Sequence, residues 1–358
     1  MIPSRLASVL RGMADSGIPQ MIVSDPSAIF YLTGTWIQPG ERMLALRLSR
    51  GGRHALFVNE LFSVPDELGV ETIWFNDTQD GVELLAGYLD TDRTVGIDKA
   101  WPARFLLRLM ELQPSHRFVN ASVLIDRLRM QKDERERELM REASRLNDLA
   151  LARVVALLSQ RHSEKRLAQC VLEVYEELGA EGCAFEPIIA YGPNAAESHH
   201  TPGRRVPTAG DCVLIDIGCR KDGYCSDMTR TLFYKQASAE ARAVYAIVLE
   251  AQRRAIALVR PGARFCDIDA AARDHIAAAG YAAQFTHRTG HSIGLDVHEY
   301  GDVSAVNTEP VRPGMVFSIE PSIRVPGDFG IRIEDLVLVT DDGCEVLNHY
   351  DTALRIVS

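Results

Sequence analysis

Two segments in the second half of the chain each join a turn glycine to an apolar strand that ends in an acid, and this repeat constrains the fold most. The segments are GDCVLID at 210–216 and GMVFSIE at 314–320, whose final acids lie 104 residues apart. A second acid follows each of them, Asp227 after eleven residues and Glu334 after fourteen. Similarity at a fixed offset indicates two similar halves related by a pseudo-twofold axis. A chance match between two strands that end in acids is the alternative.

The four acids of this repeat point to bound cations. They are Asp216, Asp227, Glu320 and Glu334. A carboxylate at the end of an apolar strand loses its hydration at a cost unless it is paired or coordinates a metal. The four would also repel one another if the two halves brought them together. A pair of divalent cations would remove that repulsion.

A segment punctuated by glycines supplies candidate nitrogen ligands. HRTGHSIGLDVHEYG holds His287, His291 and His298 at steps of four and seven residues. Neutral imidazole is a common ligand of transition metals, and one histidine with four carboxylates suits Mn²⁺, Co²⁺ or Fe²⁺ better than a thiolate zinc site does. Two metals about 3.5–4 Å apart activate a water and polarise a carbonyl, which is the chemistry of amide hydrolysis without a covalent intermediate.

The composition excludes several other classes of protein. The chain has 358 residues, of which 46% are hydrophobic and 25% charged, as is ordinary for about two soluble globular domains. Its net charge of -10 disfavours a non-specific nucleic-acid binder. Without a run of 18 apolar residues or the pattern of a signal peptide, we expect no membrane span and no secretion. Seven cysteines without a C-x-x-C pair favour free thiols in the cytoplasm.

The pattern of predicted elements divides the chain into two regions. The first alternates strands with helices, which is typical of an α/β layer domain that ends near residue 125. Its strands are predicted at 21–26, 43–49, 54–59, 72–75 and 94–98, and its helices around 3–16, 80–89 and 102–112. A charged helix with one apolar stripe is predicted from residue 131 onward and opens the second region.

The second region combines this long helix with further helices and strands. Helices are predicted at 163–178, 239–259 and 267–279, because a glycine or Arg-Pro-Gly follows each. The strands that carry or adjoin the candidate acids are predicted at 212–218, 226–234, 315–321 and 331–340.

Six segments resemble the pita-bread metallopeptidases, a family that includes prolidase, aminopeptidase P, methionine aminopeptidase and creatinase. They occur in the family order as GPNAAESHHTP, GDCVLIDIG, GYCSDMTRT, HRTGHSIGLDVHE, GMVFSIEP and FGIRIED. AIFYLTG at 28–34 and RLRMQKDERERELM at 127–140 resemble the creatinase/prolidase N-terminal domain. The resemblance implies an α/β N-terminal domain over residues 1–125. It also implies an α+β pita-bread catalytic domain with an internal pseudo-twofold over residues 126–358.

The same resemblance implies a ligand set for two divalent metal ions, with Mn²⁺ favoured and Co²⁺ or Zn²⁺ as alternatives. The ligands would be Asp216, Asp227, His291, Glu320 and Glu334. Asp227 and Glu334 would bridge the two ions. Glu320 would also act as the acid and base that handles the proton of the nucleophile.

Three other histidines receive roles from the resemblance. His199 would lie near the substrate or the leaving group. His298 would stabilise the oxyanion, and His287 would contact the substrate. His200 is assigned no role. Beside the metals, Arg332 would hold a bridging carboxylate.

Tyr224 and Thr229 flank Asp227 and would supply hydroxyl groups near it. The chain departs from the family where a prolidase binds the C-terminus of its substrate. Prolidases commonly carry an arginine shortly after V-H-E, whereas this chain has Asp302 there and no arginine before residue 312. We predict that Arg324, which follows the E-P pair closely, supplies the substitute cation.

The leading hypothesis is an Xaa-Pro dipeptidase, a prolidase that hydrolyses the amide bond before proline through a metal-bridging hydroxide. An Xaa-Pro aminopeptidase of the aminopeptidase P type, acting on longer peptides, and a metal-dependent hydrolase of another small amide are alternatives. A metal-free creatinase-like enzyme and a non-enzymatic binding protein are less favoured, because such relatives lack ligands that this chain keeps. The expected partners are a proline-containing dipeptide or short peptide and a second copy of the chain in a homodimer.

Overall fold

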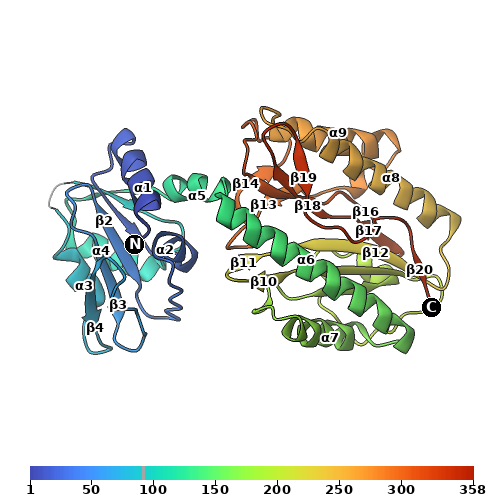
Figure 1. Cartoon of the computed structure of the whole chain (residues 1–358), viewed down its shortest axis with the longest axis horizontal. Helices are drawn as coiled ribbons and strands as arrows, with labels where there is room; N and C mark the ends of the chain where they lie inside the picture. Colours follow the sequence, from blue (N-terminus) through green and yellow to red (C-terminus); the bar gives the residue numbers. More distant parts are fainter. Residues whose placement is uncertain (91–92) are drawn as a thin grey trace. The chain divides into compact units, whose positions relative to one another are not determined.

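The computed structural model describes residues 1–90 and 93–358, which form two compact units, Met1–Arg129 and Met130–Ser358 (Figure 1). The boundary expected from the sequence, between residues 125 and 126, falls inside helix α5 (Val123–Met130) and stays a prediction. Within the described ranges, no helix is both long enough and apolar enough to cross a membrane.

The first unit contains a six-stranded mixed sheet in the order β4-β3-β2-β1-β5-β6. Its strands are β1 (Gln20–Val23), β2 (Ala45–Ser49), β3 (Ala55–Asn59), β4 (Glu71–Phe75), β5 (Thr94–Ile97) and β6 (Arg117–Asn120). Its helices are α1 (Pro3–Asp15), α2 (Pro26–Thr33), α3 (Gly81–Ala86), α4 (Ala103–Leu112) and α5. Side chains of α3 and α4 pack on the sheet in one apolar core. The sequence interpretation found the other elements but missed α2, α5 and β6.

The second unit is built on two larger sheets, ordered β20-β12-β9-β8 and β14-β13-β15-β18-β19. The first comprises β8 (Ile188–Tyr191), β9 (Cys212–Ile217), β12 (Met228–Tyr234) and β20 (Ile356–Val357). The second comprises β13 (Gly290–Ser292), β14 (Glu299–Val303), β15 (Val316–Ile319), β18 (Asp335–Val339) and β19 (Cys344–Val346). Smaller sheets join β7 (Gly182–Cys183), β10 (Cys219–Lys221) and β11 (Tyr224–Cys225), and β16 (Ser322–Val325) with β17 (Phe329–Arg332).

Four long helices cover these sheets. They are α6 (Glu134–Ala156), α7 (Glu164–Glu177), α8 (Ala239–Ala257) and α9 (Phe265–Ala278). Helix α6 begins with a capping box, since Asp133 and Glu136 each accept a hydrogen bond from the other's backbone N–H. Side chains of α6 and α7 share one core with β8, β9 and β12. Side chains of α8 and α9 share the other core with β15 and β18, and in Figure 1 these two helices lie at the upper right of the unit, above α6 and α7.

The predicted internal repeat is present in the paired strands at the centre of the two sheets. Strands β9 and β12 are antiparallel neighbours, and so are β15 and β18. Each pair carries one acid at the end of its first strand and another just before its second strand. The four acids therefore come from equivalent places in the two halves, as the pseudo-twofold requires.

The single strand predicted at 331–340 is wrong. The chain there forms β17, leaves it after Arg332, and starts β18 at Asp335 in a different sheet. The intervening Glu334 donates its backbone N–H to the carbonyl of Thr229, 3.1 Å away in the other half. An apolar run with an acid inside it predicts one continuous strand. In the structure, the hydrogen bond between Glu334 and Thr229 interrupts the strand.

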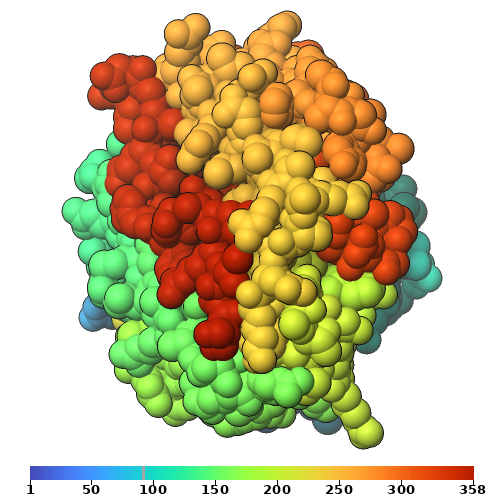
Figure 2. Space-filling view, turned by 90° about the vertical axis from the view of Figure 1, so that its right-hand side faces the viewer, coloured from blue at the N-terminus to red at the C-terminus, as the bar shows by residue number. Residues whose placement is uncertain are grey.

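The C-terminal segment ties two of the helices to the unit. The backbone N–H groups of His349 and Tyr350 donate to Asp148 on α6, at 2.7 and 3.0 Å. The hydroxyl of Tyr245 on α8 donates to the carbonyl of Thr352 at 3.0 Å. Figure 2 shows this segment (red) between the green of α6 and the gold of α8.

Candidate metal centre

The alternation of side chains along β9 brings Asp216 into the interior of the second unit. Val213, Ile215 and Ile217 belong to the core under α6 and α7. Leu214 faces the opposite core, and the two-residue period of a strand puts Asp216 on that same side. The carboxylate is consequently buried, with 6% of the residue exposed.

His291 reaches the centre because β13 lies very close to β15. A Cβ atom on Gly290 would come within 1.8 Å of the carbonyl oxygen of Ser318, so only glycine fits before this histidine. The backbone N–H of His291 then donates to the Ser318 hydroxyl at 3.0 Å. That hydroxyl also donates to Glu320 Oε1 at 3.3 Å, which links two of the predicted ligands.

The predicted ligands converge on one point. Ligand atoms of Asp227, His291 and Glu334 all lie within 4.8 Å of one another. The Nε2 atom of His291 is 3.6 Å from Asp227 Oδ2 and 3.5 Å from Glu320 Oε1. Asp216 lines the same cavity, where the guanidinium of Arg332 forms an ion pair with it.

The electrostatics of the cluster favour cation binding. Burial, reinforced by neighbouring acids, holds the pKa of Asp227 and that of Glu334 well above their ordinary values. Burial likewise raises the pKa of Glu320 to about 7. The pKa of Asp216 is raised by burial too, although the positive charge of Arg332 opposes the rise. Burial and mutual repulsion disfavour the simultaneous ionisation of these acids, and bound divalent cations would stabilise the ionised carboxylates.

His291 presents an unprotonated nitrogen to the cluster. Burial lowers the pKa of its imidazole to about 3, so the ring is neutral. Its Nδ1 atom faces the backbone carbonyl of Ser292 at 3.3 Å, and a carbonyl only accepts, so Nδ1 carries the proton. The lone pair of Nε2 therefore points at the carboxylates, which is the state in which histidine ligates a metal.

Two buried oxygen atoms support a metal at this point. Asp216 Oδ1 and Asp227 Oδ1 are shielded from solvent and find no hydrogen-bond partner within the described part of the chain. A buried carboxylate oxygen left without a partner is costly. Hard oxygen donors with one imidazole are suitable ligands for divalent ions such as Mn²⁺, so the residues present fit a metal centre.

A relay of side chains holds the carboxylates in place. The Thr229 hydroxyl donates to Glu334 Oε2 at 2.6 Å and accepts from Arg332 Nε at 2.9 Å. Arg332 in turn pairs with Asp216. Thr229 and Arg332, both predicted from the sequence, thus connect acids from the two halves of the repeat.

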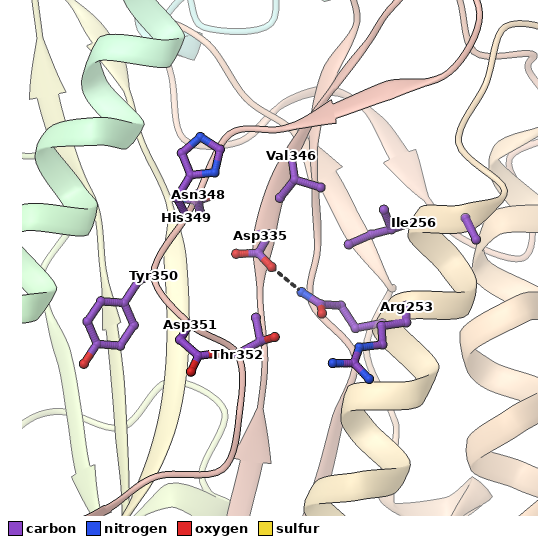
Figure 3. A pocket seen from close by; sticks show the side chains of 11 residues that line it. Arg253, Ile256, Asp335, Val346, Asn348, His349, Tyr350, Asp351 and Thr352 are labelled. Atoms are coloured by element: carbon purple, nitrogen blue, oxygen red, sulfur yellow. Dashed lines mark hydrogen bonds between the residues drawn. The ribbon is translucent and has the colours of Figure 1, made fainter.

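A second brace lies behind Glu334. The next residue, Asp335, points to the opposite side of β18, where it pairs with Arg230 at 2.6 Å and accepts from Gln252 at 2.7 Å. Arg230 also donates to the carbonyl of Glu334 at 2.6 Å. Asp335 lines a separate pocket of about 500 Å³ beside α8, and the dashed line that starts at Asp335 in Figure 3 marks its hydrogen bond to Gln252, which is not labelled there. The sequence interpretation did not include this brace.

The remaining predicted histidines lie around a cavity of about 880 Å³ that contains the carboxylates. The ring of His298 contacts the His291 ring edge to face, with centroids 4.3 Å apart. His199 lines the cavity on a segment after β8, and its side chain is exposed. His287 also lines it, but both ring nitrogens are engaged, with Nδ1 2.6 Å from the Arg288 carbonyl and Nε2 2.7 Å from the Ser322 hydroxyl.

Neither Tyr224 nor Thr229 lines the cavity, but Thr229 bonds to the ligand Glu334, whereas Tyr224 has its side-chain hydrogen bond elsewhere. Its hydroxyl donates to Glu136 Oε1 on α6 at 2.6 Å, and it is not among the residues that line the cavity. The short strand β11 pairs with β10, so proximity in sequence to Asp227 does not carry Tyr224 to the same side.

Two arginines in the cavity wall differ in their partners. Arg288, which sequence reasoning missed although it lies in the H-R-T-G-H segment, is paired with Asp302. Arg324 on β16 contacts the hydroxyl of Ser198, and among the described residues no carboxylate lies within ion-pair distance of it. Burial lowers the pKa of Arg324 to about 10, which still leaves the side chain a cation at neutral pH.

Comparison with known proteins identifies the class to which this fold and site belong. The model of metallopeptidase family M24 matches residues 138–341, and that of the creatinase/prolidase N-terminal domain matches residues 5–131. The chain therefore belongs to metallopeptidase family M24, which confirms the predicted family, fold class and divalent-metal chemistry.

Individual relatives agree with that assignment. An uncharacterized peptidase of Staphylococcus aureus is 34% identical over 340 residues, covering 92% of this chain and 94% of the relative. The prolidase of Thermococcus sibiricus is 32% identical, with a TM-score of 0.95 over 99% of this chain and 98% of that one. Dipeptidase PepE of Mycobacterium ulcerans is 34% identical, with a TM-score of 0.93 over 99% and 97%.

Proposed function

We propose that this chain is a dinuclear-metal Xaa-Pro dipeptidase that hydrolyses the amide bond before a C-terminal proline. The ligands of the two ions are Asp216, Asp227, His291, Glu320 and Glu334. When bound, such ions polarise the scissile carbonyl and lower the pKa of water at the site. The similarity of this chain to the Thermococcus sibiricus prolidase and to the Mycobacterium ulcerans dipeptidase supports a dipeptide substrate.

The chain's own side chains handle the proton and the developing charge. Glu320 takes the proton of the attacking water at Oε1, the atom that already faces His291 at 3.5 Å. His298, which packs against the His291 ring, stabilises the negative charge that develops on the carbonyl oxygen. His199 also lines the cavity and contacts the proline side of the scissile bond.

The observation that carries the choice of a dipeptide is the arginine without a carboxylate partner. Arg324 is only partly exposed, lines the cavity, and has Ser198 as its side-chain contact. A desolvated guanidinium gains most from a carboxylate that binds it in a fork-like geometry. The C-terminal carboxylate of an Xaa-Pro dipeptide is such a group, and it is available only when proline is the last residue.

The test compares Xaa-Pro dipeptides with the same dipeptides amidated at the C-terminus. Arg324→Ala lowers kcat/KM for the free dipeptide by about 10- to 100-fold, because a charge-assisted hydrogen bond contributes about 1.5–3 kcal/mol. The same variant leaves the amide substrate unaffected. Arg288→Ala is the matched control, since Arg288 lines the same cavity but is already paired with Asp302. An equal loss on both substrates in Arg324→Ala would overturn the assignment.

We further propose the metal, the assembly and the compartment. Mn²⁺ is the preferred ion, because four carboxylates and one imidazole make a hard, oxygen-rich ligand set. The chain works as a homodimer, as the family resemblance implies. Its seven cysteines are free thiols in the structure, which is consistent with a reducing cytoplasm.

A further inference from the structure

A buried glutamate outside the metal centre organises the segment that carries His199. Glu164 is the first residue of α7 and is fully buried. Its Oε1 atom accepts from the Tyr191 N–H at 2.9 Å and from Asn194 Nδ2 at 2.8 Å. Its Oε2 atom accepts from the Gly203 N–H at 2.9 Å. One carboxylate thus anchors both ends of the chain between residues 191 and 203.

The middle of this segment is held by His200. Its Nε2 atom lies 2.9 Å from Glu164 Oε2, and its Nδ1 atom lies 3.0 Å from Glu197 Oε2. Ionised carboxylates only accept hydrogen bonds, so both ring nitrogens donate when the ring is an imidazolium. The side chain of Glu197 is 67% exposed, whereas that of Glu164 is at 0%. The protonated ring therefore joins an outer acid to an inner one.

The two residues between Glu197 and His200 face the catalytic cavity. Ser198 contacts the guanidinium of Arg324, and His199 lines the cavity wall. The 3₁₀ turn η2 (Gly192–Ala196), which precedes them, is seated on β17, where a Cβ on Gly330 would come within 1.8 Å of the Ala195 carbonyl. After that turn, the segment is held by the contact of Ser198 with Arg324 and by the hydrogen bonds of His200 to Glu197 and Glu164.

We propose that His200 is a positioning residue, which fixes Ser198 and His199 at the cavity wall by bridging Glu164 and Glu197. The activity readout of this inference rests on the proposed dipeptidase function. Burial alone would lower the pKa of His200, but its hydrogen bonds to the two glutamates outweigh burial and raise the pKa above the ordinary 6.5. Glu164 on α7 and Glu197 on its own segment are the charged groups that act on the ring.

The sign of the pH dependence follows from the raised pKa. The bridge is complete while His200 is protonated and loses one of its two hydrogen bonds as the pH rises through the pKa of the folded protein. In the Mn²⁺-loaded protein, the pH profile of kcat/KM for an Xaa-Pro dipeptide therefore shows a decrease, an alkaline step, as the pH rises through the pKa of His200. His200→Gln, which keeps a single donor nitrogen and carries no charge, lowers kcat/KM about tenfold at pH 6 and lacks this step.

The variant Glu197→Gln tests whether His200 positions the cavity wall or only stabilises the fold. It removes the charge of the exposed partner, so the same step moves to lower pH while the protein remains folded. His349→Gln is the matched control, because His349 is exposed and lines a different pocket. Wild-type kcat/KM in His200→Gln, or an alkaline step that Glu197→Gln does not move, would overturn the proposal.

Hydrogen exchange tests the bridge without any substrate. In the Mn²⁺-loaded protein at pH 6, the amides of residues 197–203 exchange about tenfold faster in His200→Gln than in the wild type, after correction for intrinsic rates. Equal exchange in the two proteins contradicts the bridge. If the wild type cleaves no Xaa-Pro dipeptide, the proposed function fails, while this exchange comparison still decides the role of His200.

Discussion

Replacing Thr229 by valine should weaken metal binding although Thr229 is not itself a ligand. Its hydroxyl is fully buried, donates to Glu334 Oε2 at 2.6 Å and accepts from Arg332 Nε at 2.9 Å. A hydrogen bond to a charged group contributes about 1.5–3 kcal/mol, and valine keeps the shape of threonine while removing both bonds. Glu334 then loses the group that orients it, and the Arg332 Nε–H is left buried without its acceptor.

The expected loss is about 10- to 100-fold in Mn²⁺ affinity, which is typical when a group that orients a metal ligand is removed. Titration calorimetry on EDTA-stripped protein measures it directly. Thr229→Ser keeps the hydroxyl and should retain most of the affinity. Thr231→Val is the matched control, because the Thr231 hydroxyl is equally buried on β12 but bonds only to backbone atoms of Arg332, at 2.9 and 3.1 Å.

The two valine variants are expected to lose similar thermal stability and to differ in metal affinity alone. If Thr229→Val binds Mn²⁺ as tightly as the wild type, the relay from Arg332 through Thr229 to Glu334 has no role in holding the metal. If Thr231→Val weakens binding equally, the loss reflects general destabilisation and the reasoning from side-chain contacts is refuted.

Three further outcomes are expected from the same centre. Asp227→Asn should leave one metal ion or none per chain by elemental analysis and abolish hydrolysis; unchanged turnover would contradict its role as a ligand. His298→Ala should lower kcat by about 10²–10³-fold with little change in KM, as for the loss of one oxyanion donor, and full activity would remove it from the mechanism. Because burial raises the pKa of Glu320 to about 7, this carboxyl costs the metal-free protein nothing below about pH 4.5, where it is protonated in both states, and its ionisation should cost about 3 kcal/mol of unfolding free energy by pH 7. Denaturant titrations between pH 5 and 8 check this last outcome, and a flat profile would count against a strained carboxylate cluster.

The acid repeat and His291 could be predicted because short segments of the sequence carry the residues of the site in recognisable local patterns. A glycine, an apolar strand and a terminal acid recur in the same order, and the alternation of β9 alone puts Asp216 on the inner side. Helix α2 was missed although its signals are present. Asp25 caps it by accepting from the Ser27 N–H at 3.2 Å, Pro26 follows, and Gly34 ends it with a φ of +78°.

The parts that escaped prediction depend on contacts between segments far apart in sequence. The break between β17 and β18 is set by the Glu334 backbone and Thr229, 105 residues earlier. The same holds for the pairing of Arg230 with Asp335 behind the metal centre. Tyr224 shows the converse, since closeness to Asp227 in sequence suggested a shared site, whereas pairing of β11 with β10 turns its hydroxyl to Glu136. Sequence spacing identifies which residues carry the chemistry, and the tertiary contacts decide which of them meet.

The central claim is that the metal-loaded cavity cleaves Xaa-Pro dipeptides. The most direct measurement is hydrolysis of an Xaa-Pro dipeptide and an Xaa-Pro-Xaa tripeptide by EDTA-stripped protein reloaded with Mn²⁺. We predict that the Mn²⁺-loaded protein cleaves the dipeptide rapidly and the tripeptide only slightly. The metal-free protein should cleave neither substrate. Efficient cleavage of the tripeptide would move the activity to an aminopeptidase, and cleavage of neither with two metal ions bound would contradict the proposed substrate.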